Sequence, residues 1–176
     1  MRKAVLLLLL CLPIALFAQD NTTQDSTRGP STRAERDRAL KINKELEADP
    51  LAPQYRADRA WLIQWIQDIP DITVQICVDP VEGNSNYRYS RELLLQKTFA
   101  SAAYIIEHSV RDRDDISVET AGVEGALKAY ESILKKYPQA HSPYWDRLLK
   151  KRDNGTLRDY VTRYMESACG SEQQQA

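Results

Sequence analysis

Apolar residues recur at helical spacing along most of the chain, and this pattern predicts an all-α protein. A first helix spans residues 33–48 and ends at Asp49, because a residue that precedes a proline avoids the helical conformation. A second helix opens near Pro53, since proline is favoured at the first helical position, and it ends at Pro70. Its apolar face consists of Trp61, Leu62, Trp65, Ile66 and Ile69.

The segment from Ser90 to about His108 is apolar on most sides, which is typical of a helix buried in the middle of a bundle. Its charged and amide side chains exclude it as a membrane span. The next helix runs from about Ser117 to Tyr137 and ends before Pro138. These two segments are expected to form the centre of the fold.

Two shorter helices complete the predicted bundle. Ser142 and Pro143 are typical of a helix start, and Asn154-Gly155 is typical of a helix end. Thr156 begins the last helix, whose apolar positions are Leu157, Tyr160, Val161, Tyr164 and Ala168. The prediction is a compact all-α bundle of five to six helices.

The stretch Asp71–Val78 fits two patterns. Alternating apolar residues (Ile72, Val74, Ile76 and Val78) fit a strand, whereas the spacing of Ile69, Ile72 and Ile76 fits one helical face. A lone strand would leave its backbone groups without partners, and no second clear strand exists in the sequence. We therefore favour a helix here.

The N-terminus has the pattern of a secretory signal peptide over residues 1–18, with two basic residues, an apolar run and a small residue at its end. The apolar run is shorter than the ~20 residues that span a bilayer. We expect cleavage, and hence a secreted or periplasmic protein without stable membrane insertion. An uncleaved anchor is the alternative.

Composition then divides the remaining chain. Residues 19–32 are polar and predict a disordered leader, residues 170–176 predict a disordered tail, and residues 33–169 form one helical domain. The six glycines are too few for a turn-rich β fold, and the net charge of −1 gives no field that would attract nucleic acid.

Cleavage would also remove Cys11 and leave Cys77 and Cys169. An even number of cysteines in an oxidising compartment predicts a disulfide. It would close a loop of about 90 residues and stabilise the fold by about 4 kcal/mol in the chain-entropy model. Two separate buried thiols are the alternative.

Residues 122–138 resemble the second helix of a tetratricopeptide repeat. Ala126, Tyr130 and Pro138 lie at the spacing of that family's alanine, aromatic residue and proline. The resemblance implies a close helix–helix contact at Ala126 and a helix that ends before Pro138. An ordinary amphipathic helix ended by proline accounts for the same residues. The wider build, with a leader, helices and two cysteines, is similar to that of small periplasmic helical proteins.

The sequence contains no recognisable catalytic, cofactor-binding or metal-binding motif. His108 and His141 lack the spacing of metal ligands, and each lies near a predicted helix end. The acidic cluster Asp112–Asp115 lacks the glycine of a calcium loop and is expected to be solvated. We therefore expect no enzyme activity, no metal and no cofactor.

Aromatic residues supply the candidate contact surface. Trp61, Trp65 and Trp145 are expected in the core, whereas Tyr87-Arg88-Tyr89 follows a polar loop and is expected to be exposed. Tyrosine and arginine are enriched in binding hot spots. The sequence thus favours a protein–protein interaction module. The alternatives are a small enzyme or small-molecule binder with a pocket between helices, and a structural or stress-protective protein.

Overall fold

The computed structural model describes residues 28–74, 86–108 and 115–168, and within these ranges all regular structure is helical. The order of elements is α1 (Arg33–Ala48), the 3₁₀ turn η1 (Pro53–Tyr55), α2 (Arg56–Asp68), α3 (Ser90–His108), α4 (Asp115–Lys136), α5 (Pro143–Asp153) and α6 (Leu157–Ala168). The prediction of an all-α bundle of five to six helices is confirmed.

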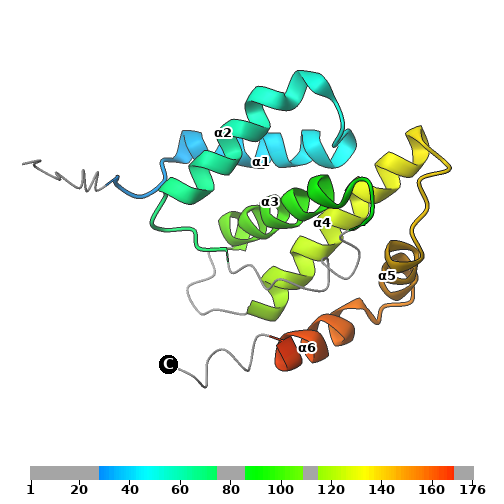
Figure 1. The fold of residues 1–176 in the computed structure, drawn as a ribbon. Helices are drawn as coiled ribbons and strands as arrows, with labels where there is room; N and C mark the ends of the chain where they lie inside the picture. The colour runs from blue at the N-terminus through cyan, green and yellow to red at the C-terminus, as the bar shows by residue number, and fades with distance from the viewer. Residues whose placement is uncertain (1–27, 75–85, 109–114, 169–176) are drawn as a thin grey trace, which may run out of the picture.

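Helices α3 and α4 pair along their lengths at the centre of the molecule (Figure 1). Helices α1 and α2 lie on one side of this pair, and α5 and α6 lie on the other. The close approach of α3 and α4 depends on glycine, because a Cβ added at Gly122 would lie 2.9 Å from the carbonyl oxygen of Lys97. A β-carbon at Gly125 would overlap the side chain of Ala100 in the same way.

Two apolar clusters flank this central pair. The first joins α3 and α4 to α5 and α6, and its largest buried side chains include Leu93, Leu127, Tyr130, Trp145 and Leu148. The second joins α3 to α1 and α2 through Ile42, Leu46, Leu62, Trp65 and Phe99. Because α3 contributes to both clusters, it is buried on most sides, as its sequence predicts.

All three tryptophans belong to these clusters or pack against them. Trp65 and Trp145 are buried, in agreement with the prediction. Trp61 is only half-buried, stacks on Trp65 and lies under the guanidinium of Arg38, which is 4.0 Å from its ring centroid. Trp61 packs against the second cluster, and the arginine over its indole face adds a favourable cation–π arrangement.

Helix α1 begins with a complete capping box. The hydroxyl of Thr32 accepts a hydrogen bond from the backbone N–H of Glu35, and the Glu35 carboxylate accepts one from the backbone N–H of Thr32. Arg28 forms an ion pair with the same carboxylate. The box satisfies amide donors that the first turn of a helix leaves unpaired.

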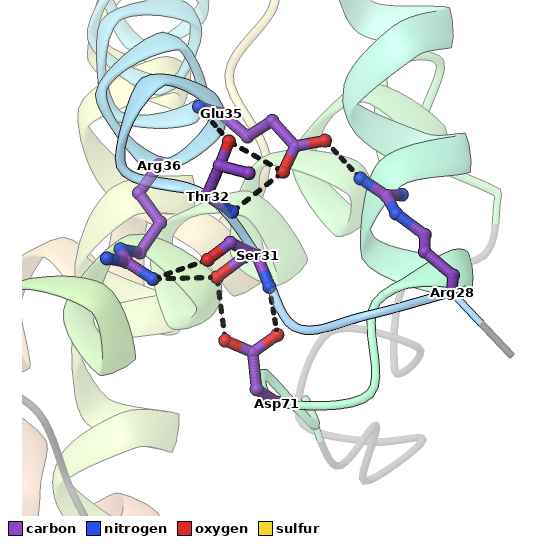
Figure 2. A network of polar contacts seen from close by, with 6 residues as sticks. All are labelled: Arg28, Ser31, Thr32, Glu35, Arg36 and Asp71. Carbon is purple, nitrogen blue, oxygen red and sulfur yellow. Dashed lines mark hydrogen bonds and ion pairs between the residues drawn. The ribbon is translucent and has the colours of Figure 1, made fainter.

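Ser31 ties this helix start to the segment after α2 (Figure 2). Its backbone N–H and its hydroxyl donate to the two carboxylate oxygens of Asp71, at 2.8 and 2.7 Å. Arg36 donates to the carbonyl oxygen of Ser31 at 2.8 Å. The prediction of a disordered leader through residue 32 is therefore wrong for residues 28–32, because capping and these hydrogen bonds offset the cost of ordering them.

The favoured helix over Asp71–Val78 is wrong in its described part. Residues 71–74 lie in an irregular segment. Ile69 is already extended at the end of α2, and Pro70 offers no backbone N–H to continue the helix. Ile72 is buried in the second cluster, so its apolar character serves packing without regular structure.

Several predictions concern residues outside the described ranges. They are the signal peptide (1–18), most of the leader (19–27), Cys77 with residues 75–78, Asp112–Asp114, Cys169 and the tail (170–176). The disulfide thus stays a prediction. Among the described helices, none has both the length and the apolar character needed to cross a membrane.

Candidate functional site

The predicted contact residues Tyr87, Arg88 and Tyr89 lie immediately before α3. Arg88 is exposed as expected, but the two tyrosines are half-buried. The hydroxyl of Tyr87 donates to the carbonyl oxygen of Ala140 at 2.8 Å, and its ring meets the ring of Tyr130 edge-on. Burial raises the pKa of Tyr87 to about 12, so this hydroxyl remains a hydrogen-bond donor at neutral pH.

Tyr89 is held by a different partner. Its ring stacks on that of Tyr137 with centroids 6.1 Å apart, and the guanidinium carbon of Arg88 lies 5.4 Å from the centroid of Tyr89. Tyr137 directly follows α4, so the start of α3 and the end of α4 meet here. We call Arg88, Tyr89 and Tyr137 the Arg88 surface.

Beneath this surface lies a polar network that no pattern in the sequence indicates. Tyr130 is fully buried, and its hydroxyl donates to a carboxylate oxygen of Asp146 at 2.8 Å while it accepts the backbone N–H of Ser142, also at 2.8 Å. Burial raises the pKa of Tyr130, which therefore stays protonated. Both hydrogen bonds connect α4 to the start of α5.

His141 is the exposed end of the same network. Its Nδ1 lies 3.1 Å from the Asp146 carboxylate oxygen that Tyr130 also contacts. A carboxylate beside one ring nitrogen fixes the orientation of an imidazole, and such a histidine can act as a general base. No local motif reveals this network, because Tyr130 and Asp146 come from different helices.

Ala126 and Tyr130, two of the positions behind the tetratricopeptide resemblance, are both fully buried. Ala126 belongs to the first apolar cluster, where α4 packs on its neighbours. This burial suits an ordinary amphipathic helix equally well, so the resemblance stays a prediction.

A buried ion pair lies elsewhere between α3 and α4. Lys97 Nζ is 2.5 Å from Glu119 Oε1, and each side chain is only 4% exposed. Burial raises the pKa of Glu119, and the nearby Lys97 ammonium lowers it in part. The same interface includes Ser101, whose hydroxyl donates to the carbonyl oxygen of Val118 at 3.3 Å.

His108, the other histidine, lies far along the chain from the network of Tyr130, Asp146 and His141. Its ring stacks on Tyr104, and its Nδ1 is 2.9 Å from the Tyr104 carbonyl oxygen in the last turns of α3. Across the described ranges, no cluster of three or more His, Cys, Asp or Glu residues could hold a metal ion.

A scan against protein-family models finds no match to this chain, and searches of curated proteins and of solved structures find no significant similarity. Functional proposals therefore rest on the residues themselves.

Proposed function

We propose that this chain is an exported helical protein whose domain acts as a protein–protein interaction module in the cell envelope. The N-terminal pattern of residues 1–18 supports export, and the all-α bundle supports a rigid binding domain. The Arg88 surface is the contact region in this proposal.

The preorganisation of that surface is the observation that carries the proposal. Tyr89 is half-buried and stacked on Tyr137, and Arg88 is exposed beside the ring. The neighbouring Tyr87 anchors the turn before α3 through its hydrogen bond to Ala140. Aromatic and arginine side chains that are already ordered lose less conformational entropy on binding, which is a property of interface hot spots.

Site-specific photo-crosslinking tests this proposal. A photoreactive amino acid replaces Arg88 in the full chain, and a matched variant carries it at Lys41, which is exposed on α1. In cells of the source organism, we expect a discrete crosslinked species from position 88 and none from position 41. Equal crosslinking at both positions, or none at position 88, would contradict the Arg88 surface as the interface.

A second candidate, a small enzyme, is favoured by the Asp146–His141 pair. An imidazole oriented by a carboxylate can accept a proton from water or from a substrate hydroxyl. A panel of chromogenic esters and amides tests this function, with His141→Gln as the matched variant. Turnover by the wild type that disappears in the variant would support an enzyme, and absence of turnover across the panel would count against it.

A further inference from the structure

Helix α5 is strongly basic, and its two acidic residues are both engaged. Asp146 contacts Tyr130 and His141, and Asp153 pairs with Arg152 at 2.9 Å. Arg152 in turn makes a two-pronged contact with Glu131 of α4, at 2.7 and 2.8 Å. Arg152, one of the four cations of this helix, is thus paired with Glu131 and Asp153, and the carboxylate of Asp146 is turned toward Tyr130 and His141.

The other three cations form what we call the α5 basic face: Arg147, Lys150 and Lys151. Arg147 and Lys150 are exposed, and Lys151 is half-buried. Among the ion pairs within the described ranges, none involves these three side chains. The face therefore presents three cationic side chains that form no ion pair with an acid of the described residues.

Two aromatic rings flank the α5 basic face. The guanidinium carbon of Arg147 lies 5.9 Å from the ring centroid of Tyr144, and the ammonium of Lys151 lies 4.9 Å from that of Tyr160 on α6. Both rings are half-buried. They limit the freedom of the two long cationic side chains, which lowers the entropy lost when an anion binds.

The spacing of the cations fits an extended chain with alternating acids. At a rise of ~1.5 Å per residue, Arg147 and Lys151 lie ~6 Å apart along the helix axis. Side chains on one side of an extended peptide repeat about every 6.6 Å. Two acidic residues separated by one residue can therefore face both cations.

We propose that the α5 basic face binds an extended acidic segment of a protein partner. A membrane surface fits the face less well, because peripheral helices insert an apolar face into the lipid. Of the large aliphatic and indole side chains of α5, Trp145 and Leu148 are buried in the first cluster and Leu149 packs against it. The inference does not depend on the Arg88 surface, which lies at the start of α3 and the end of α4.

The test measures binding of a fluorescein-labelled peptide in which glutamate and threonine alternate, by anisotropy at low salt. We expect saturable binding by the wild type, and a loss of about tenfold or more in the triple variant Arg147→Glu, Lys150→Glu and Lys151→Glu. A matched triple reversal of exposed cations on the other side of the bundle, at Arg33, Lys44 and Arg56, changes the net charge equally and should retain binding. Circular dichroism verifies that both variants are folded.

Four outcomes would overturn the proposal. The first two are no binding by the wild type and equal loss of binding in the two triple variants. The third is equal binding of a peptide that has glutamine in place of glutamate. The fourth is displacement of the peptide by vesicles of anionic phospholipid but not by an excess of unlabelled acidic peptide. The variant Arg88→Glu should bind the peptide as the wild type does. This result separates the α5 basic face from the Arg88 surface, so either can fail without the other.

Discussion

Replacing Lys97 by methionine is the sharpest test of how the central helix pair is held together. Methionine retains much of the length of the side chain but removes the ammonium that lies 2.5 Å from Glu119. An exposed ion pair contributes about 0–1 kcal/mol, whereas removing one partner of a buried pair costs about 3–5 kcal/mol. Because each side chain is only 4% exposed, the larger range applies. That loss is a large part of the roughly 5–15 kcal/mol that typically separates folded from unfolded protein.

The loss should also depend on pH, and the pKa of Glu119 gives the sign. Burial raises this pKa in the folded protein, and Lys97 lowers it in part. Without Lys97 the folded pKa rises further, so the folded state retains a proton that the unfolded state releases. A group with a raised folded pKa contributes stability below its unfolded value and loses it as pH rises through the folded value. The deficit of Lys97→Met should therefore be larger at about pH 8 than at about pH 5.

Urea unfolding followed by circular dichroism measures these effects at both pH values. The double variant Lys97→Met with Glu119→Leu should recover most of the lost stability, since it removes the unpaired carboxylate as well. Lys41→Met is the control, because Lys41 is 75% exposed and its ion pair with Glu45 should contribute under about 1 kcal/mol. A loss below about 1 kcal/mol for Lys97→Met, with no dependence on pH, would refute the reasoning.

Three further predictions concern single contacts. Tyr130→Phe should cost about 1–3 kcal/mol in urea unfolding, because a buried backbone N–H loses its acceptor; an unchanged midpoint would contradict this. Burial acts to raise the pKa of Asp71, but hydrogen bonds from Ser31 outweigh it and lower that pKa. The destabilisation by Asp71→Asn should therefore fade as pH falls through the acid range, and a stability difference from the wild type that stays constant with pH would argue against the contact. Intact mass after alkylation without reductant should show Cys77 and Cys169 protected, and two added groups would exclude the disulfide.

The sequence predicts the helices well because each has a sufficient apolar face and clear end signals. Pro70, Pro138 and Gly155 mark helix ends that depend on backbone geometry alone; Gly155, for example, has a φ of 75°. The start of α1 is also readable, since Thr32 and Glu35 have capping-box spacing. Polar composition alone predicts a disordered leader through residue 32. For residues 28–32 the capping-box spacing predicts the observed structure better than composition does.

The polar contacts could not be predicted, since they depend on which helices meet. In the sequence Lys97 only argues against a membrane span, and its burial follows from Glu119, which α4 places opposite it. His141 has no partner at metal-ligand spacing, and its contact with Asp146 forms where the chain turns into α5. A single sequence gives apolar periodicity, but it does not give the pairing of individual side chains across helices.

The packing of α3 against α4 also explains why the Arg88 surface can be rigid. Gly122 allows the two helices to approach closely, and the approach fixes where the start of α3 lies relative to the end of α4. Tyr89 lies at the start of α3 and Tyr137 lies at the end of α4, so the two rings can stack only if these helix ends keep their relative positions. A bulky residue at Gly122 should therefore loosen a surface far from the substitution, and the stability of the bundle and the order of its contact residues should decline together.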